Sequence, residues 1–388
     1  MRLFTRSDAP RPAPAAVGCR RPARAHDGRG PPTTGRCDRG GAVAGADRPA
    51  DRARLVTPGW PAAPPTDAAP LHGLAVVVVS YGSSHLLDAG LPATLTAAGA
   101  HVVVVDNDSG DAERRAATAL CAARGWLLVP SANDGFGAGC NRGVAAARAA
   151  GCDVVLLLNP DAAVTSEDAR TLLEHVRRHP GDVVSPVVVL PTGRESFVGA
   201  VVDVPAGRTR RPRPGDAATL RPWLSGACLA LHVDTYTALG GFDERYFMYW
   251  EDVDLSWRAV GRGARLVVRD DVRVVHEVGG TEGGVGKSPL YCYWNCRNRM
   301  LFAALHLAPA DRRRWALRSG AYALEVVLRS GRRVAVRSPR AALAAVRGTV
   351  AGLLLARRSA PDDRAGHGGG DGDRGAGGGA GPGGGRRA

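Results

Sequence analysis

Three continuous apolar runs constrain the fold of this chain more than any other feature. Each run has the length of one strand and no alternation with polar residues, as expected of a strand buried on both faces. Segments with a helical pattern follow the runs along the chain. The runs are Leu74–Ser80, His101–Asp106 and Asp153–Leu158, and the helical segments are Leu86–Ala98, Ala112–Arg124 and Ser166–His179. This alternation predicts the α/β fold class, with a doubly wound, mostly parallel sheet and helices on both faces.

After Leu224 the pattern changes. A helix is predicted at Glu251–Val260, extended chain at Ala264–Val275 and a long helix at Pro289–Leu307. Amphipathic helices rich in arginine are predicted for the C-terminal part of the chain, the last of them at Ala341–Ala356. That segment contains an arginine and is too short to span a membrane.

The basic character of the chain lies in its flanks. The whole chain has a net charge of +14, but residues 71–300 carry −2, residues 1–70 carry +6 and residues 301–388 carry +10. A nucleic-acid-binding domain would concentrate basic side chains on its own folded surface. No nucleic-acid partner is therefore expected.

Composition divides the chain into four segments. Residues 1–70 are rich in Pro, Ala and Arg and show no apolar periodicity, so they are either disordered or lie upstream of the true start of translation. Residues 71–300 form the predicted α/β domain, residues 301–358 a basic helical extension, and residues 359–388 a disordered Gly-rich tail.

Cysteine usage and the N-terminus indicate the compartment. The eight cysteines are scattered and form no CxxC pair, which is typical of free thiols in a reducing environment. No apolar run follows Arg2 and Arg6, so no secretory signal is expected. A cytoplasmic protein is predicted.

Polar residues follow each of the three apolar runs. Ser80 and Tyr81 end the first run, Asp106 begins the acidic segment after the second, and Asn159-Pro160-Asp161 follows the third. A single acidic strand end is usually a turn or a helix cap. Because the carboxyl ends of parallel strands meet at one edge of a sheet, three together predict a ligand-binding crevice.

A glycine-rich segment, Asn133–Gly143, precedes a predicted helix. Glycines let the backbone approach a ligand closely, and a helix N-terminus favours an anion. Neither the dinucleotide fingerprint nor the P-loop spacing is present. The segment indicates a phosphate-bearing ligand, with a tight turn before a helix as the alternative.

A carboxylate cluster lies further along the chain. Glu251, Asp252 and Asp254 occur within four positions and are flanked by aromatic residues. Burial of a carboxylate raises its pKa and suits it to act as a general base, and aromatic side chains suit the faces of sugars. An Asp254–Arg258 pair one helical turn apart explains only part of the pattern. A lone histidine is more often structural than a ligand, but the position of His276 after an extended run and before a Gly-rich loop strengthens the case for a ligand role.

In their order along the chain these motifs resemble those of family 2 glycosyltransferases of the GT-A fold, and in particular bacterial rhamnosyltransferases. The resemblance runs from about Leu74 to about Phe302. The motifs are DNDSGD, NDGFGAGCNRG, NPD, SGACLA, GGFDE and FMYWEDVDLSWR, followed by His276.

The resemblance implies an inverting, metal-dependent hexosyltransferase of EC class 2.4 that builds cell-wall polysaccharide. Asp252 resembles the catalytic base, with Glu251 beside it, and Asp161 and His276 resemble ligands of Mn²⁺ or Mg²⁺. The implied donor-binding residues are Ser80, Tyr81, Asp106, Asn133, Gly135, Asn141, Asn159 and Asp161. The implied acceptor or sugar pocket consists of Trp223, Ser225, Gly226, Tyr249 and Trp250.

The implied donor is a nucleotide sugar, first of all dTDP-rhamnose, and the implied acceptor is a glycan or a polyprenyl-diphosphate-linked sugar. Such an acceptor lies in the bilayer, and the arginine-rich extension suits an anionic surface on the inner face of the cell membrane. Three alternatives stay open: transfer of galactofuranose, transfer of another hexose, and a non-catalytic basic protein at the membrane surface. Homodimer formation also stays open.

Overall fold

The computed structural model describes residues 5–6, 70–216, 220–277, 287–329 and 338–358. It divides into two compact units. The first consists of Met1–Val202, Arg210–Phe247 and Glu251–Gly283, and the second of Asp203–Thr209, Met248–Trp250 and Gly284–Ala388. Of the two segments expected to be disordered, residues 359–388 and nearly all of residues 1–70 lie outside the described residues.

The centre of the first unit is a ten-stranded sheet. Its strands are β1 (Thr5–Arg6), β2 (Leu74–Ser80), β3 (His101–Asn107), β4 (Leu127–Ser131), β5 (Val154–Leu158), β6 (Ala162–Ala163), β7 (Asp182–Val189), β8 (Glu195–Phe197), β12 (Cys228–His232) and β13 (Arg265–His276). The main order is β1-β13-β7-β12-β5-β2-β3-β4, with β6 beside β13 and β8 beside β7. Short strands also form at β9 (Ala200–Asp203), β10 (Arg208–Arg210) and β11 (Arg221–Trp223), and β9 pairs antiparallel with β11.

Most neighbouring strands of the main sheet are parallel, which confirms the predicted fold class. β2 runs parallel to β3 and β5, β3 to β4, and β7 to β13. Along the main order β12 is the exception, because it runs antiparallel to both β5 and β7. Off that order, the short strands β6 and β8 also pair antiparallel, with β13 and β7. The sequence pattern had not separated β12 from the apolar segment around it. The reversal of β12 brings the residues just before Cys228 to the edge where β5 ends.

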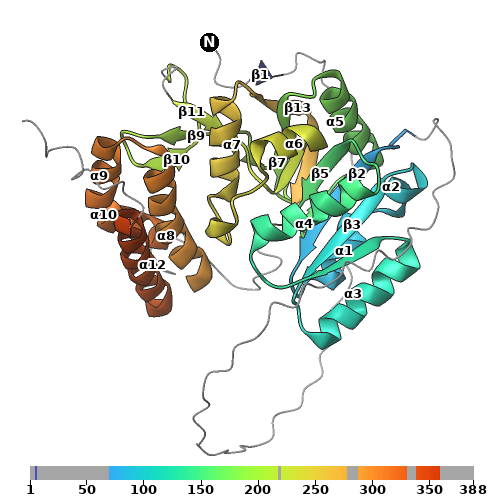
Figure 1. The fold of residues 1–388 in the computed structure, drawn as a ribbon, viewed down its shortest axis with the longest axis horizontal. Helices are drawn as coiled ribbons and strands as arrows, with labels where there is room; N and C mark the ends of the chain where they lie inside the picture. The colour runs from blue at the N-terminus through green and yellow to red at the C-terminus, as the bar shows by residue number, and fades with distance from the viewer. Residues whose placement is uncertain (1–4, 7–69, 217–219, 278–286, 330–337, 359–388) are drawn as a thin grey trace, which may run out of the picture. The chain divides into compact units, whose positions relative to one another are not determined.

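Helices cover both faces of this sheet (Figure 1). They are α1 (Ser84–Gly90), α2 (Ala93–Ala97), α3 (Asp111–Arg124), α4 (Phe136–Ala149), α5 (Ser166–Arg178), α6 (Val233–Leu239) and α7 (Glu251–Gly261), with a short 3-10 helix at Glu244–Tyr246. Along β2, Val76 belongs to the hydrophobic cluster that includes residues of α1, α2, α3 and α5, whereas Val77 belongs to the cluster that includes residues of α4, α6 and α7. The all-apolar strand is therefore buried on both sides.

The helix predicted at Leu86–Ala98 is two helices. α1 ends at Gly90, and α2 starts after Pro92, whose backbone is extended. A proline inside a helix has no N–H to donate and clashes with the preceding turn, so the chain breaks there.

The second unit contains α8 (Pro289–His306), α9 (Pro309–Leu317), α10 (Ser319–Leu328) and α12 (Pro339–Arg358). α12 packs on α8 through small residues: a Cβ at Gly348 would lie 2.1 Å from the Tyr293 carbonyl oxygen. At 20 residues α12 is longer than the sequence pattern indicated. Among the described residues, α12 is long and apolar enough to cross a membrane. The prediction that this segment is too short to span a membrane was therefore wrong.

Candidate active site

Asn159, Asp161 and His276 come together at the carboxyl edge of the first unit's sheet. β5 ends at Leu158, and the chain then turns into β6, where Ala162 pairs with His276 at the end of β13. The Asp161 Oδ1 atom lies 2.9 Å from His276 Nε2, and Asn159 Nδ2 lies 3.3 Å from the same nitrogen. Two segments more than a hundred residues apart thus meet where the polar strand ends had predicted a crevice.

These donor atoms fit a divalent cation only in part. Across the described ranges, no three His, Cys, Asp or Glu side chains gather closely enough to hold a metal ion. Asp161 and His276 supply one carboxylate and one imidazole at hydrogen-bond distance from each other. That pair suits an ion such as Mn²⁺ that takes its other ligands from a substrate diphosphate. The Gly-rich loop after His276 lies outside the described residues.

Asp252 lies in the first turn of α7 and reaches the same edge through the segment before β12. Its Oδ2 accepts a hydrogen bond from Gly226 N at 3.1 Å, and its Oδ1 accepts one from Val253 N at 2.8 Å. The residue after Gly226 is Ala227, whose carbonyl oxygen accepts a hydrogen bond from Asn159 N at 3.0 Å. The base candidate and the metal-ligand candidates are therefore joined by one short run of backbone.

The environment of Asp252 suits a base that works near neutral pH. Burial raises the pKa of Asp252 to about 6, although the backbone N–H groups of Gly226 and Val253 act in the opposite direction. A general base is most effective when its pKa is close to the working pH.

Glu251 is more deeply buried than its neighbour. Glu251 is 6% exposed, and its Oε2 atom has no hydrogen-bond partner among the described residues. Burial, together with the nearby Asp252 carboxylate, raises the pKa of Glu251 well above its ordinary value. Burial therefore disfavours the ionised form of Glu251, which favours Asp252 as the ionised carboxylate of the pair.

Asp254, third of the carboxylate cluster, is paired. Its Oδ2 accepts from Arg258 Nε at 2.7 Å, one helical turn along α7, and Tyr246 Oη lies 3.3 Å from its Oδ1. Tyr246 is fully buried. The structural explanation that the sequence allowed for Asp254 and Arg258 is confirmed for this residue.

The segment before α7 has an unusual backbone. Phe247, Tyr249 and Trp250 all have positive φ, at 60°, 63° and 76°. Left-handed backbone costs free energy in residues other than glycine and tends to occur at functional sites. The spacing of the sequence had not signalled it.

Gly135 packs directly against this segment. Its φ is 106°, and an added Cβ would lie 2.1 Å from the Phe247 carbonyl oxygen, which also accepts a hydrogen bond from Phe136 N at 2.7 Å. Further along α4, Gly139 and Gly143 lie against Val79 and Val77 of β2. The glycines therefore let α4 approach the sheet and the 247 turn, a structural role beside the ligand role predicted for Gly135.

The predicted donor residues lie at the ends of β2 and β3. Ser80 is buried with its Oγ 2.9 Å from Ser83 Oγ, whereas Tyr81 is exposed. Asp106, which pairs with Ser80 in the sheet, accepts from Arg114 Nε at 2.6 Å. Burial alone would raise the pKa of Asp106, but the hydrogen bonds from Arg114 and Ser109 outweigh it and lower the pKa.

Two residues that the sequence pattern had not indicated lie beside these. Arg114, in the first turns of α3, holds Asp106 in place. Asn107 donates from Nδ2 to Asn133 Oδ1 at 3.0 Å, and its own Oδ1 is buried without a partner among the described residues. The position of Asn107 directly after Asp106 was the available signal for this residue, whereas Arg114 lies eight positions beyond Asp106 and carried none.

Asn141 makes different contacts from the other residues predicted to bind the sugar donor. Its Nδ2 donates to the Phe242 carbonyl at 2.9 Å, and its Oδ1 accepts from Tyr236 Oη at 2.5 Å and from Phe242 N at 2.9 Å. Asn141 thereby fastens α4 to the turn before the 3-10 helix.

The predicted pocket residues divide between the two units. In the first unit, Ser225 and Gly226 flank the contact with Asp252, and the Trp223 ring lies 5.2 Å from that of Phe197. In the second unit, Trp250 is buried against Phe302 and Trp315 with ring centroids 5.4 Å and 6.0 Å away. Tyr249 lies beside Tyr291 in the same unit. Trp250 is therefore part of the core, whereas Trp223 and Tyr249 are half-buried.

Comparison with known proteins agrees with this arrangement. The family model for glycosyl transferase family 2 matches residues 75–217. N-acetylglucosaminyl-diphospho-decaprenol L-rhamnosyltransferase from Mycobacterium tuberculosis is 30% identical over 235 residues, which cover 52% of this chain and 75% of the relative. Rhamnosyltransferase WbbL from Escherichia coli is 26% identical over 152 residues, covering 34% of this chain and 57% of the relative.

Among solved structures, GalNAc-T7 with UDP, GalNAc and Mn²⁺ is 16% identical and covers 60% of this chain and 50% of that one, at a TM-score of 0.43. The family assignment comes from the sequence relatives. Their identity and coverage, with the motifs gathered at one sheet edge, show that the chain belongs to glycosyl transferase family 2.

Proposed function

We propose that this chain transfers a sugar from a nucleotide-sugar donor to a glycan or polyprenyl-diphosphate-linked acceptor, with inversion at the anomeric carbon. Rhamnose from dTDP-rhamnose is the first donor to test, because the two relatives described above carry rhamnosyltransferase names. The observation that carries the proposal is the contact of Asp252 with Gly226, one residue from the backbone link to Asn159.

In this proposal Asp252 takes the proton from the acceptor hydroxyl as that oxygen attacks the anomeric carbon. The bond from this carbon to the diphosphate oxygen breaks on the opposite side, so one displacement inverts the configuration. A single ionised carboxylate suffices, and no second nucleophilic carboxylate is needed. The raised pKa of Glu251, caused by its burial, supports this division of roles within the pair.

Asp161 and His276, with Asn159 beside them, are the residues proposed to hold a divalent cation. Bound there, the cation would neutralise the negative charge that develops on the departing diphosphate. Ser80 and Asp106 form the proposed nucleotide rim, where the Asp106–Arg114 pair fixes the direction of the carboxylate. Attachment to the inner face of the cell membrane by the basic residues 301–358 is part of the proposal, since a lipid-linked acceptor lies there.

The test separates donor binding from chemistry. The purified full chain is screened against nucleotide sugars by thermal shift, with and without Mn²⁺, because a donor that binds the folded state raises the melting temperature. The donor that binds is then incubated with a prenyl-diphosphate-linked N-acetylglucosamine, and product formation and anomeric configuration are measured.

Asp252→Asn is the matched variant. It should keep the donor-induced thermal shift and lose transfer by about a thousandfold. Transfer at the wild-type rate by Asp252→Asn, or retention of configuration in the product, would overturn the mechanism. Absence of any thermal shift with every nucleotide sugar would overturn the transferase proposal itself.

A further inference from the structure

The outer face of α12 carries a stripe of exposed aliphatic side chains. Leu343, Val346, Val350 and Leu354 are 59%, 56%, 51% and 50% exposed. They recur every three or four residues and so lie along one side of the helix. We call these four residues the apolar stripe. Single exposed apolar side chains are ordinary on a protein surface, but a continuous row of them on one helix is not.

The opposite side of α12 fixes the direction in which the apolar stripe points. Ala341, Ala345, Gly348, Gly352 and Ala356 are buried on that side. Cβ atoms added at Gly348 and Gly352 would lie 2.1 Å and 2.7 Å from carbonyl oxygens of α8. Because the two backbones approach this closely, α12 cannot rotate to bury the apolar stripe against the rest of its unit.

Charge selects the partner of this surface. Arg340, Arg347 and Arg358 are exposed and, by helical spacing, share one flank of the apolar stripe. Residues 301–358 contain 12 Arg, with Asp311 and Glu325 as their acids. Both acids form ion pairs, with Arg314 for Asp311 and with Arg208 and Arg329 for Glu325. A second copy of the chain would bring arginines against arginines, whereas an anionic lipid surface offers both phosphate charge and apolar depth.

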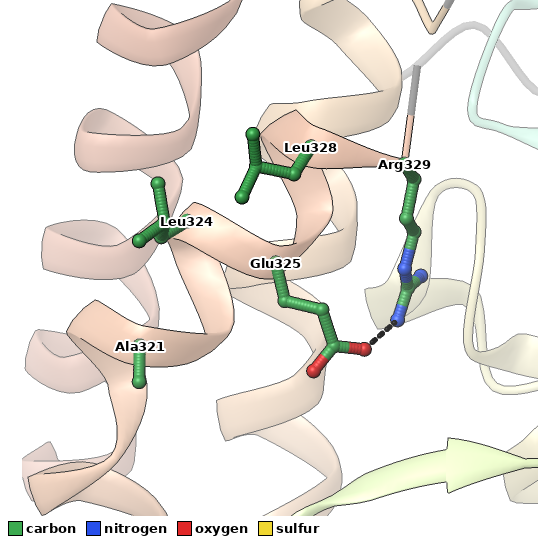
Figure 2. A pocket seen from close by; sticks show the side chains of 5 residues that line it. All are labelled: Ala321, Leu324, Glu325, Leu328 and Arg329. Carbon is green, nitrogen blue, oxygen red and sulfur yellow. Dashed lines mark hydrogen bonds and ion pairs between the residues drawn. The ribbon is translucent and has the colours of Figure 1, made fainter. Parts of the chain in front are cut away.

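A neighbouring groove in the same unit adds apolar surface. α10 packs against α12 and bears a shallow groove of about 420 Å³. Figure 2 shows that Leu324 and Leu328 line this groove together with the ion pair of Glu325 and Arg329. A groove of this kind has room for part of a lipid chain.

α12 has the length of a membrane span, but its charge does not suit one. Arg347 lies near its middle and is exposed. A span would carry this charged side chain into the hydrocarbon core of the bilayer at high cost. A helix with an apolar stripe and flanking arginines lies in the plane of the interface instead.

We propose that the apolar stripe of α12 inserts in the plane of an anionic membrane surface, with Arg340, Arg347 and Arg358 on the lipid phosphates. This membrane contact rests on the proposed function, because it would bring the enzyme to a lipid-linked acceptor. It adds to that function the face of the protein that makes the contact.

The experiment is co-sedimentation of the full chain with vesicles of phosphatidylglycerol and phosphatidylcholine, and with vesicles of phosphatidylcholine alone. The native chain should partition onto the anionic vesicles, and less so at high salt. Val346→Asp/Val350→Asp should lower that partitioning about tenfold or more. Ala116→Asp/Ala119→Asp adds the same charge at exposed positions of α3 in the first unit and should leave partitioning unchanged.

A second variant guards against misfolding of the first. Arg340→Gln/Arg347→Gln alters two exposed side chains and should remove the preference for anionic lipid. Equal partitioning of the native chain and of both variants would overturn the proposal. It would also be overturned if the native chain formed a dimer that Val346→Asp/Val350→Asp dissociates. A native chain that stays in cell membranes after an alkaline carbonate wash would overturn it as well.

Sugar transfer to a water-soluble acceptor analogue separates this inference from the proposed function. Val346→Asp/Val350→Asp and Arg340→Gln/Arg347→Gln should both retain that transfer. If the native chain transfers no sugar but partitions through the apolar stripe, the proposed function fails and the membrane inference stands. If the native chain transfers sugar but Val346→Asp/Val350→Asp partitions onto vesicles as the native chain does, only the membrane inference fails.

Discussion

Each of the two units buries an ionisable side chain, and the hydrogen bonding of the two side chains differs. In the second unit Arg299 is 1% exposed, and no carboxylate among the described residues binds it. Its guanidinium donates to the carbonyl oxygens of Gly207 and Trp315 and to Ser319 Oγ, and it lies 4.7 Å and 4.6 Å from the ring centroids of Trp315 and Tyr322. In the first unit Glu251 is nearly as buried, yet one of its oxygens has no described partner.

The difference separates a group that holds the fold from one that serves chemistry. Buried polar groups are nearly always hydrogen-bonded, so an unpartnered one calls for an explanation such as catalysis. Arg299 is satisfied by backbone and ring faces, and it ties α8 to α9 and to the 203–209 segment. Glu251 instead lies beside Asp252, a carboxylate whose raised pKa suits a base.

The largest effect is expected on the first-unit side of the comparison. Asp161→Ala should lower kcat/KM for sugar transfer by about a thousandfold, because the charge on the departing diphosphate loses its counterion site. Asp153→Ala is the control, since Asp153 precedes the other end of β5 and pairs with Arg177. It should change kcat/KM less than about twofold. Similar losses in both variants would mean that the strand, and not the site, is sensitive.

A smaller but still large effect is expected in the second unit. Arg299→Ala should lower the free energy of unfolding by about 3 kcal/mol, because several buried acceptors lose their donor and a cavity opens between Trp315 and Tyr322. Urea unfolding measures it. Arg313→Ala, exposed on α9, should change the value by less than about 0.5 kcal/mol. Equal stability of the two variants would show that Arg299 does not hold the unit together.

The smallest effect concerns Glu251 and depends on pH. Burial raises its folded pKa above the ordinary 4.5, so above that pH the folded chain binds more protons than the unfolded one. Its contribution therefore lowers stability as pH rises. Glu251→Gln does not titrate, so its stability relative to wild type should increase by about 1–2 kcal/mol between about pH 5 and pH 8. Thermal unfolding at several pH values measures this, and parallel curves for the two proteins would contradict a protonated Glu251.

Much of the first unit could be predicted because local pattern and tertiary role agree there. The runs at Leu74–Ser80 and Asp153–Leu158 are apolar on both faces, and the sheet buries them on both faces. β12 could not be predicted, because its antiparallel direction depends on β5 and β7 and not on its own five residues. Pro92 was a local signal for a break in the helix, and the apolar periodicity around it concealed that signal.

The site divides in the same way. That Asp161 and His276 meet follows from the pairing of β6 with β13, which no local pattern encodes, although the resemblance implied it. The aromatic residues around Asp252 invited a sugar-binding interpretation, but composition cannot distinguish an open ring face from a packed one such as Trp250. Positive φ at Phe247 and its packing on Gly135 arise from contacts between segments distant in sequence.

The pH dependence of kcat/KM tests the central claim, that Asp252 is the base of a sugar transfer, most directly. Burial raises its pKa to about 6. Transfer should therefore rise with pH, reach a plateau above about pH 6, and fall about tenfold per unit below it. Asp252→Asn should lack this acid limb and run about a thousandfold slower at every pH. A flat profile in the wild type, or the same acid limb in Asp252→Asn, would contradict the account.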